Sequence, residues 1–294
     1  MNYSAMIKLA VSMALFGSIG FFTRQTGIEA IELVFVRCIC ATLFLGALWL
    51  LTKRYKTERW ERRELVRTVI CGVFLVLNWV FLFKAFEEMS ISVAISIYNI
   101  APIFVLLFGA LFLKEYLSFG AILATACCFF GSVLIVGFNE LQSIEALMNS
   151  DFIWAFLSAC FYALTMITSK TIQHLSSYAL TFIQTTVGIV MLAPFCDFTV
   201  FNGLTTSNWL YILATGFIHT GFVYYLFFDS VRSLSTVIVS VLVFVDPLVA
   251  ILLDVLILSF RPDMWQLLGM ALIFGGILYT VYEPMRNDLR KRHV

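Results

Sequence analysis

The residue with the clearest chemical potential is Asp246, a carboxylate about ten residues into the apolar run 236–258. If that run is a membrane-spanning helix, a rise of ~1.5 Å per residue places Asp246 near mid-membrane. Insertion there costs roughly 2.5–3.5 kcal/mol, so such a residue indicates a functional site. Asp246 could bind and release a proton for coupling, or hold a cationic group of a substrate. The alternative is a packing role, with a hydrogen bond to a neighbouring helix beside Pro247.

Other polar and aromatic side chains interrupt runs that are otherwise apolar. Amides, aromatic rings and one imidazole in an apolar cavity suit a small amphipathic ligand, because rings contact both cations and apolar groups. Each aromatic residue taken singly is better explained by packing, and a lone histidine is more often held by a structural hydrogen bond. With Asp246, the predicted substrate-binding residues are Asn78, Trp79, Tyr98, Asn99, His219 and Tyr224.

Two prolines occupy the middle of long apolar runs. Pro102 and Pro247 lack a backbone N–H, and their rings clash with the carbonyl groups of Tyr98 and Val243, four residues earlier. This predicts two helix kinks whose freed carbonyls line a polar cavity. Proline kinks also occur in membrane helices with no ligand nearby.

Arg37 and Asp254 are the other charged residues deep in predicted spans. Arg37 lies about six residues inside the run 31–51, and Asp254 about four residues from the end of 236–258. Both reach a similar depth, so they could pair. We interpret them as structural charges, while direct substrate binding by Arg37 stays an alternative.

Several chemistries lack the residues they need. The sequence contains no G-x-x-x-x-G-K-[ST] loop, no H-E-x-x-H pair and no C-x-x-C motif. Asp246 and Asp254 share one run and stand about 12 Å apart along a helix, too far for a shared-proton dyad. The 19 basic and 18 acidic residues nearly cancel, which disfavours nucleic-acid binding. We therefore predict a non-enzyme with no catalytic residue, metal site or cofactor.

The composition requires a lipid environment for these residues. Of the 294 residues 61% are hydrophobic and 13% are charged, whereas soluble domains carry about 25% charge. Runs of about 20 apolar residues predict spanning helices, since lipid offers backbone groups no hydrogen-bond partner. The predicted fold is an all-α polytopic membrane protein with ten spans: 5–22, 31–51, 65–86, 91–113, 119–138, 151–169, 177–196, 208–228, 236–258 and 264–282.

The basic residues predict the orientation of these spans. Outside Arg37, fifteen of them fall on the side that holds both termini and the arginine-rich 53–67 loop, and three fall on the opposite side. Because Lys and Arg remain on the cytoplasmic side, we expect a multi-pass protein of the cell membrane with both termini in the cytoplasm.

The two halves of the sequence repeat at a constant offset of 145 residues. Pro102 aligns with Pro247, Phe83 with Phe228, and one glycine with another in the same gapless frame. Five spans per repeat is an odd number, so the second repeat must cross the membrane with opposite polarity. Two inverted five-helix repeats around a central cavity favour alternating access.

These features resemble the drug/metabolite transporter superfamily, in its ten-helix EamA branch. The resemblance covers essentially the whole chain and is specific for fold and transporter class, not for substrate. It departs at Glu115, whose counterpart in the second repeat is Phe260. The segments that carry it are Ala14–Gly17, Arg37, Ser90–Pro102, Leu113–Glu115, Phe244–Leu252 and Gly269–Gly276.

The resemblance implies a first EamA-like repeat at 1–138, a linker at 139–150, a second repeat at 151–283 and a basic cytoplasmic tail at 284–294. It also implies a secondary transporter for an amino acid or related amphipathic metabolite, often an exporter, with proton coupling left open. The alternatives are a multidrug or cation efflux carrier and a channel-like protein. The expected partners are the small-molecule substrate, the lipid bilayer and protons, and Ala271 and Gly275 would also permit a homodimer.

Overall fold

The computed structural model of the chain describes residues 2–89, 91–136, 152–258 and 261–292. Within these ranges the backbone forms helices and connecting loops, with no strand. The predicted linker at 139–150 lies outside the described residues. Eight helices or contiguous helix pairs are long and apolar enough to cross a bilayer, and Ala101–Phe112 and Phe119–Ile135 are shorter apolar helices. The protein is therefore an all-α polytopic membrane protein, as predicted.

Five spanning units make up each repeat. In the first repeat they are α1 (Tyr3–Phe16) with α2 (Ile19–Arg24), α3 (Ala30–Leu51), α4 (Arg62–Glu88), α5 (Ile91–Tyr98) with α6 (Ala101–Phe112), and α7 (Phe119–Val136). In the second they are α10 (Phe152–Lys170), α11 (Ser177–Leu192), α12 (Thr206–Ala214) with the π-helix η4 (Thr215–Phe222) and α13 (Val223–Val231), α14 (Thr236–Leu242) with α15 (Val245–Leu258), and α16 (Met264–Arg292). Short 3-10 turns occupy Arg54–Lys56, Ala193–Phe195 and Phe198–Phe201.

The structure differs from the predicted spans where a helix is interrupted. The expected run 5–22 is broken between Phe16 and Ile19, and the fourth and ninth runs are each two half-helices separated by a two-residue turn. The last helix continues to Arg292, ten residues beyond its predicted end at 282. Hydropathy reports the length of an apolar segment. A break in the backbone helix does not change that length, so the pattern could not predict these interruptions.

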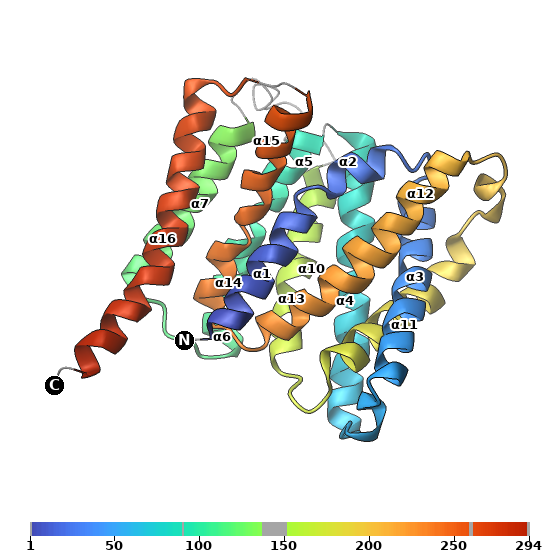
Figure 1. Ribbon diagram of the computed structural model, residues 1–294, viewed down its shortest axis with the longest axis horizontal. Coiled ribbons are helices and arrows are strands. Elements are labelled where there is room, and N and C mark those ends of the chain that lie inside the picture. Colours follow the sequence, from blue (N-terminus) through green and yellow to red (C-terminus); the bar gives the residue numbers. More distant parts are fainter. Residues whose placement is uncertain (1, 90, 137–151, 259–260, 293–294) are drawn as a thin grey trace.

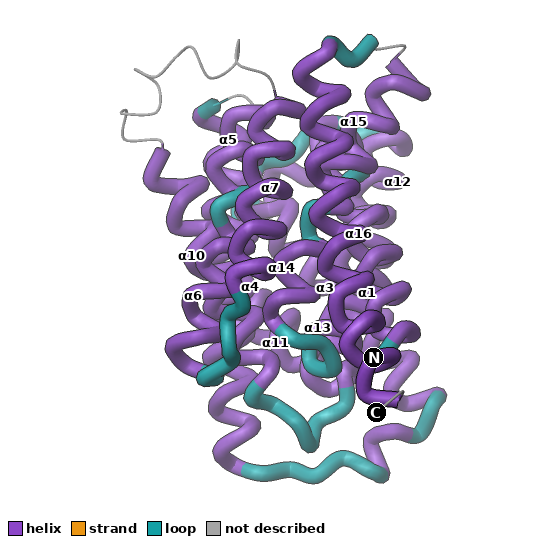
Figure 2. The backbone as a smooth tube through the Cα atoms, turned by 90° about the vertical axis from the view of Figure 1, so that its left-hand side faces the viewer, coloured by secondary structure: helices purple, strands orange, loops and turns teal. Residues whose placement is uncertain are grey.

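The two repeats run in opposite directions. Figure 1 shows α5 towards the upper end and α6 towards the lower, whereas α14 lies low and α15 high. Both labelled termini lie at the lower end of the bundle (Figures 1 and 2), which we call the terminal side. Which side faces the cytoplasm stays a prediction from the basic residues.

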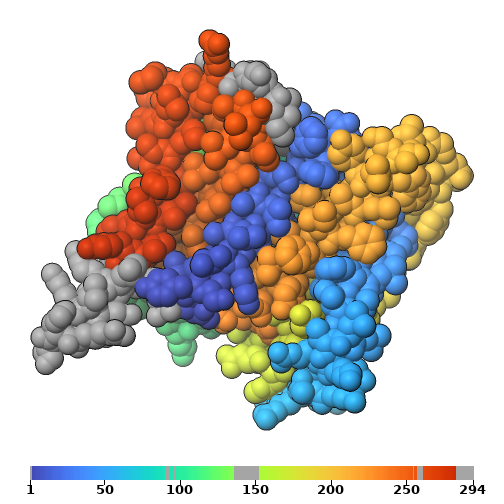
Figure 3. All heavy atoms as spheres, viewed as in Figure 1, coloured from blue at the N-terminus to red at the C-terminus, as the bar shows by residue number. Residues whose placement is uncertain are grey.

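Helix packing follows an internal two-fold relation. The contacts of α4 with α10 are matched by those of α1 with α13, and the contacts of α3 with η4 by those of α4 with α11. Helices α7 and α16 pack on each other, and so do α3 and α11. The space-filling view shows α1 crossing the visible face between the α14–α15 unit and the α12–α13 unit (Figure 3).

Two contacts lie on the internal symmetry axis, because each joins residues that occupy equivalent positions 145 apart. Trp79 Nε1 donates a hydrogen bond to the Tyr224 hydroxyl at 2.5 Å. At the α7–α16 crossing, Cys128 Sγ lies 3.7 Å from the Ile273 carbonyl oxygen. A residue can touch its own counterpart only where the axis passes, so Trp79 and Tyr224 mark the centre of the bundle.

Candidate functional site

The two interrupted helices turn within one residue of equivalent positions in the two repeats. The turn between α5 and α6 is at Asn99 and Ile100, and that between α14 and α15 is at Val243 and Phe244. Each proline occupies the first turn of the second half-helix, a position that tolerates its missing N–H. Each of the two helices is thus interrupted by a two-residue turn shortly before its proline, and a polar cavity lined by freed carbonyl groups stays a prediction. The Val243 carbonyl, expected to be free, accepts a hydrogen bond from the Asp246 N–H at 3.1 Å.

Asp246 lies in the first turn of α15, at the start of a half-helix inside the bundle. Close approach of α1 holds this segment. A Cβ atom at Gly17 would stand 2.7 Å from the Asp246 carbonyl oxygen, so no larger residue fits there without a shift. The negative charge also suits the N-terminal end of a helix dipole. The α1–α2 break thus lies directly against the α14–α15 break.

Aromatic rings from four spanning units surround this region. The centroids of Tyr98 and Tyr162 are 5.6 Å apart, and those of Tyr162 and Phe227 are 6.1 Å apart. Tyr224 lies 5.7 Å from Phe227 and 4.9 Å from Phe16. The five rings form a continuous chain of contacts, which we call the aromatic wall.

Asp246 lies beside the aromatic wall. Gly17 packs against its backbone, and the preceding residue, Phe16, is one of the five rings. Asp246 is partly exposed and forms no ion pair among the described residues. The Tyr162 hydroxyl is buried and has no hydrogen-bond partner there. The site therefore presents a carboxylate and an unused hydroxyl within an apolar, aromatic surrounding.

Asn78 and Asn99 occupy different environments. Asn78 Nδ2 donates to the Ser158 carbonyl and hydroxyl oxygens, both at 2.9 Å, and lies 3.5 Å from the Tyr98 hydroxyl. The Ser158 hydroxyl donates to the backbone carbonyl oxygen of Asn78 at 2.8 Å. Asn78 thus joins α4 to α10 and also touches the aromatic wall. Asn99 is buried at the α5–α6 turn, and its Nδ2 has no partner among the described residues.

Arg37 is fully buried beside the π-helix. Its Nε donates to the Thr220 hydroxyl at 2.8 Å, and its guanidinium lies 5.2 Å from the Trp79 ring centroid and 5.0 Å from that of Phe83. Thr220 in turn donates to the Thr215 carbonyl five residues earlier, within the π-helix. The side chain of Asp254, the proposed partner of Arg37, lies outside the described residues.

His219 is separate from the aromatic wall. Its Nε2 is 2.9 Å from the Ser18 hydroxyl, and its ring packs on Phe22 at 4.8 Å between centroids. The structure thus brings Asn78, Trp79, Tyr98, Tyr224 and Asp246 together. His219 is placed at the α1–α2 break instead.

Sequence reasoning missed Tyr162, Phe16 and Phe227. Tyr162 had a usable signal, because it lies in the middle of the run 151–169, at a depth similar to Asp246. The two phenylalanines had none, since thirty phenylalanines occur in the chain and apolar context does not separate core from lipid-facing rings.

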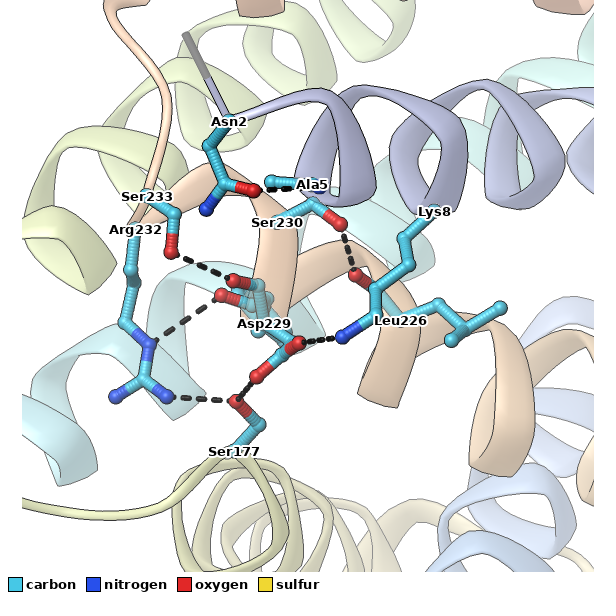
Figure 4. A network of polar contacts seen from close by, with 10 residues as sticks. Asn2, Ala5, Lys8, Ser177, Leu226, Asp229, Ser230, Arg232 and Ser233 are labelled. Atoms are coloured by element: carbon cyan, nitrogen blue, oxygen red, sulfur yellow. Dashed lines mark hydrogen bonds and ion pairs between the residues drawn. The ribbon is translucent and has the colours of Figure 1, made fainter.

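A polar network joins helices of both repeats on the terminal side (Figure 4). Lys8 Nζ lies 2.6 Å from Asp229 Oδ2, and the Ser177 hydroxyl donates to Asp229 Oδ1 at 3.1 Å. Arg232 donates to Ser177 Oγ and to the Leu175 carbonyl oxygen, both at 2.6 Å. Burial lowers the pKa of Arg232, and the charge of Asp229 opposes this shift.

A second terminal-side contact is centred on Glu115. Its Oε2 accepts hydrogen bonds from the Thr236 backbone N–H at 2.9 Å and from the Thr236 hydroxyl at 2.7 Å. Its Oε1 lies 3.4 Å from Lys170 Nζ, which also donates to the Leu234 carbonyl oxygen. We call Glu115, Lys170 and Thr236 the latch. The equivalent positions on the opposite side are Phe260, Gln25 and Ile91, so the sequence supplies no carboxylate there.

Two surface grooves lie away from these residues. One of about 390 Å³ lies between α4 and α11 and has an apolar lining. The other, of about 230 Å³, lies between α7 and α16 and is lined in part by Ala271 and Gly275. The described residues contain no group of three or more metal-ligating side chains.

Comparison with known proteins places the chain among transporters. Its sequence is 51% identical over 278 residues to the uncharacterized transporter YxxF of Bacillus subtilis (strain 168), covering 95% of this chain and 89% of that protein. It is 22% identical to an uncharacterized transporter of Archaeoglobus fulgidus, over 94% and 95% of the two chains. A solved crystal structure has the same fold, with a TM-score of 0.77 at 17% identity over 94% of this chain and 97% of that one. The model of the EamA-like transporter family matches residues 3–137 and 150–282, and the chain belongs to that family.

Proposed function

We propose that this protein is a secondary active transporter that moves a small organic metabolite, an amino acid or related amphipathic compound, out of the cell by alternating access. The observation that carries the proposal is the meeting of two interrupted helices, α6 against α14, with Asp246 in the first turn of the half-helix α15. Discontinuous helices at equivalent positions of inverted repeats are the usual construction of a mid-membrane transport site. Membership of a transporter family supports the same reading.

The internal symmetry supports the alternating part of the proposal. In an inverted repeat the two halves can exchange local shapes, which closes the opposite end of the cavity. The Trp79–Tyr224 pair maps onto itself in such an exchange, so its hydrogen bond is expected in both states. The latch does not map onto a similar contact, because its counterparts include Phe260 and Ile91. It is therefore expected in one state alone.

Proton coupling is the second part of the proposal and involves Asp246. A carboxyl group at the break of a discontinuous helix that lacks an ion-pair partner among the described residues can exchange a proton with a cavity that opens to either side. Binding of a proton in one state and release in the other would couple the proton gradient to substrate movement.

Counterflow in proteoliposomes tests the proposal. Vesicles are preloaded with single amino acids, amines or aromatic compounds, and uptake of the labelled compound is followed with wild type and Asp246→Asn. We expect saturable exchange for a limited set of compounds, and loss of proton-driven accumulation in the variant. Glu88→Gln is the matched control, because it removes an exposed carboxylate at the end of α4. Ionic conductance without saturable exchange would support a channel and refute the carrier.

A further inference from the structure

We propose that the site between the half-helices binds an organic ammonium compound with an apolar body, with Asp246 as its counter-ion and the aromatic wall around it. This inference rests on the proposed transport function and names the class of substrate. The observation behind it is geometric: Gly17 packs against the backbone of Asp246, and the preceding residue, Phe16, is one of the rings of the aromatic wall. Ammonium groups are attracted both by carboxylates and by the faces of aromatic rings.

Three lysines of the bundle are paired with carboxylates other than Asp246. Lys8 pairs with Asp229, and Lys170 belongs to the latch, both on the terminal side. Lys84 pairs with two glutamates at the end of α4. Asp246 has no ion-pair partner among the described residues, so its carboxylate is available to pair with a cationic ligand.

Arg37 is an interior cation that could compete with a ligand for the Asp246 carboxylate, but its contacts are with groups other than Asp246. Its guanidinium donates to Thr220 and lies over the rings of Trp79 and Phe83. Arg37 packs on Trp79, which donates its hydrogen bond to Tyr224 of the aromatic wall. Arg37 forms no ion pair with Asp246 among the described residues.

The aromatic wall also specifies the kind of ammonium group. Tyr162 has a buried hydroxyl without a partner among the described residues, so it can accept a hydrogen bond from an N–H donor. A primary amine supplies such a donor, whereas a quaternary ammonium does not. The partly buried ring of Phe16 offers apolar surface for the rest of the molecule. The geometry therefore favours a primary or secondary amine with an apolar group.

A structural role for Asp246 would give a different experimental result. At the first turn of α15 the carboxylate also compensates the half-helix N-terminus, so its removal would lower stability even without a ligand. Asp246→Asn keeps a polar side chain of similar size and removes the charge. Ligand affinity and thermal stability without ligand must therefore both be measured.

The experiment uses four probes that share one apolar body: benzylamine, benzyltrimethylammonium, benzyl alcohol and benzoate. Binding to the purified full-length protein in nanodiscs is measured by the ligand-dependent shift in melting temperature and by calorimetry. We expect wild type to bind the two cations and neither of the other probes. Asp246→Asn should weaken both cations about tenfold or more, which corresponds to about 1.4 kcal/mol. Glu88→Gln should bind as wild type does.

Tyr162→Phe provides a second variant that removes a single hydroxyl oxygen and is expected to fold. It should weaken benzylamine severalfold and leave benzyltrimethylammonium unchanged, because the quaternary group donates no hydrogen bond. Binding of benzoate as tightly as benzylamine, or wild-type cation affinity in Asp246→Asn, would overturn the inference.

The outcomes separate this inference from the proposed function. Saturable counterflow of a neutral or anionic metabolite, with no binding of either cation, would leave transport standing and refute ammonium recognition. Binding of the cations at Asp246 without counterflow of any amine would support the ammonium site and refute transport. Each result therefore bears on one proposal at a time.

Discussion

The latch gives the sharpest structural prediction, through the substitution Glu115→Gln. The Glu115 carboxylate accepts two hydrogen bonds from Thr236, one of them from a backbone N–H at the start of α14. Its other oxygen is paired with Lys170, whose side chain is 9% exposed. Glutamine keeps one acceptor oxygen but removes the charge, so the contacts with Thr236 and Lys170 are both weakened.

The magnitude follows from these contacts. A hydrogen bond to a charged group contributes about 1.5–3 kcal/mol, against roughly 1 kcal/mol for a neutral one. In Glu115→Gln two hydrogen bonds lose their charge assistance. The Glu115 side chain is 25% exposed, so water compensates part of this loss, and the closed latch should be destabilised by about 1.5–2 kcal/mol. The ratio of closed to open latch should therefore fall about 10- to 30-fold.

Hydrogen–deuterium exchange measures this opening at the site itself. The Thr236 amide proton is held by Glu115, so a peptide covering the start of α14 should exchange about tenfold faster in Glu115→Gln. Thr236→Val removes the hydroxyl contact alone and should produce a smaller change. The changes in latch free energy caused by Glu115→Gln and Thr236→Val should not be additive in the double variant, because both substitutions act on the same contact.

Glu87→Gln is the matched control on the opposite side. Glu87 accepts a hydrogen bond from the Ala30 N–H at 2.8 Å, so it holds the start of α3 as Glu115 holds the start of α14. This variant should speed exchange at α3 and leave α14 unchanged. Unchanged exchange at α14 in Glu115→Gln, or an equal increase in both variants, would refute the latch.

Three further substitutions test the packing of the bundle. Gly131→Ala should lower the melting temperature in detergent, because its Cβ would stand 2.6 Å from the Gly269 carbonyl oxygen, and such overpacking costs about 1–3 kcal/mol. Asn78→Leu should destabilise the protein by about 1–3 kcal/mol in a denaturation assay, since it removes the Nδ2 donor to the carbonyl and hydroxyl oxygens of Ser158, and wild-type stability would argue against that contact. Trp79→Phe should slow counterflow with little change in folding, as it removes the axial hydrogen bond; an unchanged rate would count against a central role.

Much of the fold could be predicted from local properties of the sequence. A run of about 20 apolar residues in lipid must satisfy its own backbone, so it becomes a helix whatever its neighbours are. The inverted repeat followed from an odd number of spans per repeat. The form of the interruptions did not follow, because Pro102 and Pro247 are compatible with either a kink or a new half-helix.

The candidate site was predicted in part. Asp246 was found because a carboxylate in an apolar run is unusual and visible in sequence. The repeat also relates Trp79 to Tyr224, because these residues are 145 positions apart. Only the structure shows that they form a hydrogen bond on the internal symmetry axis. Tyr162 had a usable signal in its mid-span position, but only the structure shows that its ring contacts Tyr98 and Phe227.

The sequence by itself determined that the chain spans a membrane, repeats with inverted polarity and carries a mid-span carboxylate, because hydropathy and helix formation are properties of single segments. The tertiary structure decided which polar groups meet. It placed the Gly17 break against Asp246, joined Asn78 to Ser158 and put the latch on the terminal side. Such contacts depend on how closely helices approach and at which register, which is settled by packing across the whole bundle.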